Sequence, residues 1–180
     1  SNPFPEELMN GVDEEARSFA EGLGAVLDEI DITEENKTIT KIESILPGIV
    51  INVAAYTDVD GCELNEKKAF AINAEGMKHV VLGGQTCGAK VVTLSTDYIF
   101  DGKKGSPYLE DDPPHPLNVY GRSKWKGEQY VQELVKDALI IRTQWLYVKN
   151  GKNFVDSILR QASEIRVLSI VHDKVGSATY

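Results

Sequence analysis

Helical and extended segments alternate along this chain. Residues 66–84 carry apolar residues at helical spacing, and helices are also predicted over residues 34–46, 117–136 and 153–163. Short apolar runs predict strands, and these cover residues 48–54, 90–95 and 138–143. Strands that alternate with helices of this length imply βαβ units and a mostly parallel sheet. The predicted fold class is therefore α/β.

The remaining segments are less regular. Residues 5–21 look helical and acidic, and residues 167–171 form a last apolar run. Residues 103–116 are rich in proline and predict a long irregular loop that borders a site. The sequence contains no internal repeat or low-complexity tract.

Composition narrows the function classes. The chain has 180 residues, of which 42% are hydrophobic, enough for a real core in one domain or one and a part. A net charge of -9 argues against a nucleic-acid partner, because phosphate binding relies on clustered Lys and Arg. No apolar stretch approaches the roughly 18 residues that a membrane span needs. No basic, then apolar, secretory signal is visible either, so a cytoplasmic protein without a membrane partner is expected.

The cysteines and histidines indicate no metal site. Cys62 and Cys87 are isolated and are expected to be reduced thiols. His79, His115 and His172 are scattered, and none has a second ligand at useful spacing.

The most informative pair is Tyr120 and Lys124. Residues four apart on a helix project from one face, so the phenol gains a cation as its neighbour. A nearby ammonium favours the phenolate and lowers the pKa of a tyrosine, which suits proton transfer to a carbonyl. The same spacing occurs by chance in many helices, where the tyrosine packs and the lysine reaches solvent.

Two predicted strands end in residues that suit a ligand. Ser95 and Thr96 lie at the carboxyl end of the strand of residues 90–95, and ligands of open α/β sheets bind beyond the carboxyl ends of the strands. These hydroxyls have an alternative role as caps of the next segment. The strand of residues 48–54 ends in small residues, which let a flat ligand approach the backbone. Ordinary packing of a helix on the sheet is the alternative there.

Taken together, these motifs resemble a known family. Residues 52–63, 95–102 and 116–124 are similar in sequence, order and spacing to dTDP-4-dehydrorhamnose reductase, an extended short-chain dehydrogenase/reductase. Residues 142–147, 153–154 and 176–180 continue the resemblance, which runs from about residue 27 to the end of the chain.

The resemblance implies a fold and an activity. It implies a Rossmann-like doubly wound parallel sheet over residues 1–150 and the beginning of a small substrate lobe over residues 151–180. The family reduces the C4 keto group of dTDP-6-deoxy-L-lyxo-4-hexulose to dTDP-L-rhamnose with NADPH or NADH. It leaves a requirement for Mg2+ and a homodimer open.

The resemblance also assigns roles to residues. Thr96 would form a hydrogen bond with the C4 carbonyl, and Tyr120 would donate the proton. Lys124 would hold the nicotinamide ribose and lower the pKa of Tyr120. The implied cofactor-binding residues are Asn52, Ala54, Ala55, Tyr56, Ser95, Tyr120 and Lys124. The implied substrate-binding residues are Tyr98, Trp145 and Asn153, although Trp145 equally suits a core position.

The chain departs from the family pattern in two places. A first strand followed by a glycine-rich phosphate loop is not evident, and the sequence ends where the family continues its substrate lobe. A sequence that lacks segments of the real protein, a truncated chain and a degenerate relative are the three explanations. The alternative functions are another nucleotide-sugar reductase or epimerase, a non-catalytic relative that binds a protein, and an α/β domain without a ligand.

Overall fold

The computed structural model describes residues 30–147, 153–165, 167–169 and 175–179. Residues 32–180 form one compact unit, and the description below concerns that unit. The helix predicted over residues 5–21 lies outside the described residues. Of the predicted apolar run 167–171, residues 167–169 are described and form neither helix nor strand.

Three short strands form a parallel sheet. The strands are β1 (Ile49–Asn52), β2 (Lys90–Thr96) and β3 (Ala138–Thr143), in the order β1-β2-β3. β2 pairs with both neighbours in parallel, and the pairing with β3 continues to its last residue, Thr96. The predicted parallel sheet is confirmed for these three strands, and their carboxyl ends lie at one edge.

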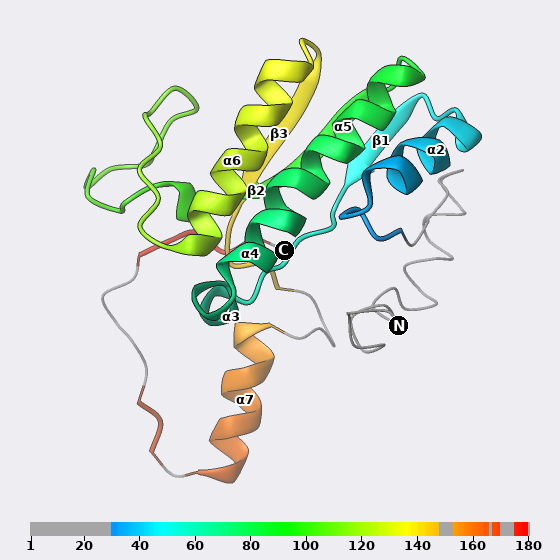
Figure 1. Ribbon diagram of the computed structural model, residues 1–180. Coiled ribbons are helices and arrows are strands. Elements are labelled where there is room, and N and C mark those ends of the chain that lie inside the picture. The colour runs from blue at the N-terminus through cyan, green and yellow to red at the C-terminus, as the bar shows by residue number, and fades with distance from the viewer. Residues whose placement is uncertain (1–29, 148–152, 166, 170–174, 180) are drawn as a thin grey trace. The chain divides into compact units, whose positions relative to one another are not determined.

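Helices cover one face of this sheet. α5 (Met77–Thr86) and α6 (Val119–Leu134) lie side by side against the strands, and α2 (Glu35–Ile45) packs on α5 (Figure 1). The core between these layers contains four fully or nearly fully buried apolar residues, which are Met77, Val81, Val91 and Val131. Their spacing along α5 and α6 is the helical spacing of the sequence, so the helix and strand assignments are confirmed here.

The segment predicted as one helix over residues 66–84 is a helix with an insertion. α4 (Glu66–Phe70) passes into a π-helix, η2 (Ala71–Gly76), which continues as α5. A six-residue helix that the sequence pattern did not indicate, α3 (Val59–Leu64), comes before it, and Asp58 caps this helix by accepting from Gly61 N at 2.9 Å. α3 holds too few residues to show an apolar period.

The opposite face of the sheet is apolar and exposed. Ile51, Leu139 and Ile141 are 63%, 55% and 40% exposed, and the strand register puts them on the face away from α5 and α6. α7 (Phe154–Glu164) also has an exposed apolar side, with Phe154 and Leu159. No helix of the described residues is both long and apolar enough to cross a membrane.

Candidate active site

The first turn of α6 is built to hold Tyr120 at the sheet edge. Asn118 caps the helix by accepting from Gly121 N at 2.7 Å, and Glu63 of α3 accepts from Val119 N at 2.6 Å. Gly121 packs so closely on the backbone of Tyr98 that a side chain has no room there. These contacts fix where α6 begins, and Tyr120 is consequently buried in its first turn.

Thr96 brings the end of β2 to the same place. Its hydroxyl accepts from Tyr98 N at 3.2 Å and donates to the Asp97 carboxylate at 3.1 Å, so it caps the short 3-10 helix Asp97–Ile99. The Tyr98 ring then meets Tyr120 edge-on, with ring centroids 5.5 Å apart. The capping role proposed as an alternative is therefore real, and it coexists with the position next to Tyr120.

Burial raises the pKa of Tyr120 above its usual value of 10.0, a hydrogen bond with Thr96 lowers it, and the charge of Asp97 raises it further. The net direction is upward because loss of solvent outweighs the hydrogen bond. A phenol in this state keeps its proton at neutral pH and is a donor. The lowered pKa that the spacing of Tyr120 and Lys124 predicted is not found: the net shift is upward, and Lys124 is not among its causes.

Lys124 does not reach into solvent. It is 5% exposed, and its Nζ donates to the carbonyl oxygen of Leu94 on β2 at 2.8 Å. Burial lowers the pKa of Lys124 to about 8, and the charge of Glu128 opposes this shift. The lysine therefore belongs to the interior at the end of β2, which excludes the solvated alternative.

A buried ion pair lies one helical turn beyond Lys124. Glu128 is 2% exposed, and Arg142 of β3 donates to it from Nη2 at 2.8 Å and from Nε at 3.2 Å. The hydroxyl of Ser95, assigned to the cofactor above, donates to the same carboxylate. Glu128 and Arg142 were not expected from the sequence. For Glu128 the signal was its spacing from Tyr120 and Lys124, at intervals of four along one helix face, and Arg142 on β3 left no such signal.

Two buried side-chain amides hold the end of β1 and the segment that follows it. Asn52 donates to the Met77 sulfur at 3.2 Å and accepts from Ala54 N at 3.1 Å, so its side chain shapes the turn after the strand. Asn73, in the π-helix η2, accepts from Tyr56 N at 2.8 Å and donates to Tyr56 O and Ser123 Oγ, both at 3.0 Å. Asn73 was also missed, and its signal was a polar residue inside an apolar helical run.

The end of β3 pairs with residues 175–179. Leu146 forms a parallel bridge with Thr179, whose amide donates to Trp145 O at 3.2 Å. Gln144, with its amide oriented to match its neighbours, joins Asp97 and Ser177 at 2.7 and 2.8 Å. Trp145 has a φ of 47° and is 48% exposed, so it is not a core residue.

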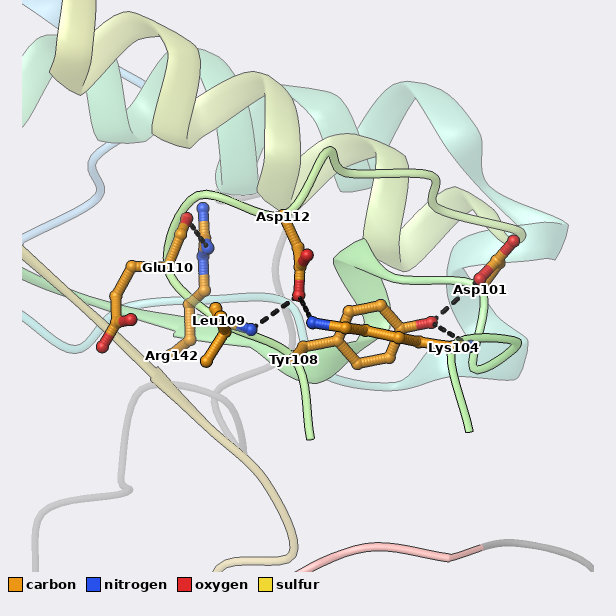
Figure 2. Close-up of polar contacts among 7 residues, drawn as sticks. All are labelled: Asp101, Lys104, Tyr108, Leu109, Glu110, Asp112 and Arg142. Atoms are coloured by element: carbon orange, nitrogen blue, oxygen red, sulfur yellow. Dashed lines mark hydrogen bonds and ion pairs between the residues drawn. The ribbon is translucent and has the colours of Figure 1, made fainter. Parts of the chain in front are cut away.

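The loop between β2 and α6 is ordered by its own polar contacts (Figure 2). Asp101 accepts from Tyr108 at 2.9 Å, and Asp112 binds Lys104 and accepts from Leu109 N at 2.7 Å. Arg142 donates from Nη1 to Glu110 O at 3.1 Å. The same guanidinium thus contacts both this loop and the buried Glu128.

The structure gathers one group of the predicted residues at a single edge of the sheet. Thr96, Tyr98 and Tyr120 meet there, and Lys124 follows Tyr120 by one turn. Ala54, Ala55 and Tyr56 follow β1 at the same carboxyl edge, where Ala54 is exposed and Ala55 half-buried. Asn153 instead caps α7 by accepting from Asp156 N at 3.0 Å. The binding roles of all these residues stay predictions.

Metal binding has no support in the described part of the chain. No three His, Cys, Asp or Glu side chains gather there in a way that could hold an ion. The Mg2+ requirement left open by the family resemblance gains nothing from this site.

Comparison with known proteins identifies the family. A family model described as the RmlD substrate binding domain matches residues 6–180. The chain belongs to this RmlD family. A dTDP-4-dehydrorhamnose reductase of Burkholderia thailandensis is 40% identical over 169 residues, which cover 92% of this chain and 56% of that protein. The spore coat polysaccharide biosynthesis protein SpsK of Bacillus subtilis is 46% identical over 134 residues, covering 74% of this chain and 47% of SpsK.

Solved structures agree with the RmlD assignment. The dTDP-4-dehydrorhamnose reductase of Bacillus anthracis, in complex with NADP, matches with a TM-score of 0.85 and 38% identity, covering 97% of this chain and 62% of that one. The Rossmann-like α/β fold and the resemblance to this reductase family are thereby confirmed. The chain spans about half the length of the two sequence relatives.

Proposed function

We propose that this chain carries the catalytic site of an NAD(P)H-dependent reductase that converts the C4 keto group of dTDP-6-deoxy-L-lyxo-4-hexulose to the alcohol of dTDP-L-rhamnose. The observation that supports this most is the meeting of Thr96 and Tyr120 at the carboxyl end of β2, with Lys124 buried behind them. Relatives named dTDP-4-dehydrorhamnose reductase and one such structure with NADP add support for the substrate and the cofactor.

In this proposal Tyr120 is the proton donor. Its raised pKa keeps the phenol protonated at neutral pH, and an acid that holds its proton until charge develops on the carbonyl oxygen suits reduction. The Thr96 hydroxyl, which donates to Asp97 in the structure, would turn its proton to the carbonyl oxygen and so orient the carbonyl. The ammonium of Lys124 stabilises the negative charge that develops on the phenol oxygen as the proton leaves.

The residues at the end of β1 suit the nicotinamide end of NAD(P)H. Ala54 is small and exposed, and Tyr56 is held by Asn73, so a flat ring has access to the backbone there. Ala54, Ala55, Tyr120 and Lys124 would hold the nicotinamide and its ribose. The cofactor, when bound, supplies the hydride to the carbonyl carbon. The Trp145 and Tyr98 side chains would border the sugar.

The first experiment is a titration of the chain with NADPH and separately with NADH, followed by quenching of Trp125 and Trp145 fluorescence. Saturable binding in the micromolar range is expected. No binding to a folded chain would contradict the proposal and favour a non-catalytic relative that binds another protein.

A Tyr120→Phe variant then tests the chemistry. If Tyr120 donates the proton, turnover of the dTDP-4-keto sugar falls about 10²-fold or more, because general acids contribute roughly that much. The dissociation constant of the cofactor stays within about a factor of three, since the ring remains. Equal turnover in the two proteins would refute the role of Tyr120.

A further inference from the structure

Two residues of α6 are attached to consecutive residues of β2. Lys124 Nζ donates to the carbonyl oxygen of Leu94 at 2.8 Å, and the hydroxyl of Ser95 donates to Glu128. Lys124 and Glu128 are one helical turn apart and face the same strand. The end of β2 thus joins an ammonium and a carboxylate within one short stretch of backbone.

Glu128 is held by three donor groups of two residues. Its two carboxylate oxygens accept from Nε and Nη2 of Arg142 in a two-pronged ion pair, and Ser95 binds one of them as well. A buried carboxylate is strongly unfavourable unless its partners satisfy it, and here they do. The side chain therefore has one position, and it cannot turn away from the helix face that it shares with Lys124.

We propose that Glu128 is a positioning residue that acts on Lys124. The carboxylate of Glu128, which Arg142 and Ser95 hold in place, supplies the negative charge that keeps the buried ammonium of Lys124 protonated at the end of β2. This rests on the proposed function only for the part that Lys124 plays in the reaction. Because Glu128 is buried and already bound by Arg142 and Ser95, its role in this proposal is exerted through Lys124.

The electrostatics of the region are consistent with this role. Burial alone disfavours the ammonium of Lys124, and among the described residues Glu128 is the group whose charge acts in the opposite direction. The other titratable or charged groups of the region come from the elements packed around Tyr120 and Glu128, and they are Cys62 of α3, Asp97 and Tyr98 of the 3-10 helix, Tyr120 of α6 and Arg142 of β3.

The test is a titration of Lys124 in the chain without any ligand. Protein labelled with 13C at the lysine ε-carbons is followed by NMR between pH 6 and pH 11, and the Lys124 signal is assigned by its loss in Lys124→Met. In Glu128→Gln the pKa of Lys124 is expected to fall by about one unit below the wild-type value, because the charge that opposes the effect of burial is removed. Glu133→Gln, an exposed acid on the same helix, is the matched control and is expected to leave the pKa unchanged.

Two further variants keep the proposal testable if Glu128→Gln does not fold. Glu128→Asp retains the carboxylate and is expected to keep the pKa of Lys124 closer to wild type than the amide variant does. The double variant Glu128→Gln with Arg142→Met removes both buried charges, and a smaller fall of the Lys124 pKa is expected. A wild-type pKa in every folded variant that lacks the carboxylate would overturn the proposal.

This experiment is independent of the reductase assignment. If the Glu128 variants shift the pKa of Lys124 but the chain binds no NADPH, the proposed function fails and the role of Glu128 stands. If NADPH binds and the pKa does not move, the role of Glu128 fails and the reductase proposal stands.

Discussion

Replacing Gly121 by alanine tests how closely α6 is fitted to the loop that carries Tyr98. A Cβ on Gly121 would collide with the carbonyl oxygen of Tyr98, and it would lie 2.9 Å from the carbonyl carbon of Tyr98 and 3.0 Å from Pro116 Cβ. These are backbone and ring atoms, which cannot swing aside as the end of a long side chain does. We expect α6 and the Tyr98 segment to move apart, and the chain to become less stable.

The size of this effect is a balance of two contributions. Alanine is favoured over glycine by about 1 kcal/mol in a helix interior, which is an upper limit for Gly121 in the first turn of α6. Overpacking typically costs 1–3 kcal/mol, and the backbone obstacle at Gly121 puts this case near or above about 3 kcal/mol. The net loss is therefore about 2 kcal/mol. With a urea m-value of roughly 2 kcal/mol per molar, the midpoint of unfolding falls by about 1 M.

Urea unfolding followed by tryptophan fluorescence measures the change. Gly48→Ala is the matched control, because no heavy atom lies within 4 Å of a Cβ at that glycine. The control is expected to stay within about 0.5 kcal/mol of wild type. A Gly121→Ala chain that is as stable as wild type, or more stable, would refute the argument, since the helix gain would then exceed the cost of the contact with Tyr98.

Two further predictions concern buried polar groups. Asn73→Ala leaves the N–H and C=O groups of Tyr56 without their side-chain partner. The free energy of unfolding in the same urea assay is expected to fall by about 1–3 kcal/mol, and a smaller fall would contradict a stabilising role of these two hydrogen bonds. Burial lowers the pKa of Lys124 from its ordinary 10.5 to about 8 in the folded chain, so the unfolded state binds more protons between about pH 8 and pH 10.5. The free energy of unfolding therefore gains a contribution that rises with pH in this range. Lys124→Met is expected to lack that contribution between pH 8 and 10.5, and an identical pH dependence in both proteins would exclude the lowered pKa.

The regular elements were predictable because their patterns are local. β3 covers the predicted residues 138–143, and α6 differs from the predicted 117–136 only at its ends, where Asn118 begins the helix as its cap. An apolar run or a helical repeat of apolar residues is a property of residues that are near in sequence. It can therefore be identified without knowing the tertiary contacts of the element. The π-helix was not predictable in this way, since its extra residue is accommodated by packing of η2 against α6.

The site was predictable only in part, for the same physical reason. Tyr120 and Lys124 share a helix face by spacing alone, and Thr96 ends a recognisable strand. Glu128 lies in a charged stretch of α6 that reads as a solvated surface, and its burial depends on Arg142, 14 residues away on β3. The spacing of four puts Glu128 on the helix face of Lys124, but it does not identify Arg142 as the partner.

The π-helix η2 has a consequence for how sequences of this kind are aligned. A π-turn holds one residue more than the α-helical turn that it replaces, so removing one residue from Ala71–Gly76 would restore an uninterrupted α-helix. In a sequence alignment such a deletion would appear as a gap of one residue. It would leave α4 and α5 near their present relative orientation, because the wide turn absorbs the extra residue, but it would remove the bulge that carries Asn73 against the backbone of Tyr56. The length of this segment, and not only its composition, therefore determines whether the end of β1 keeps its shape.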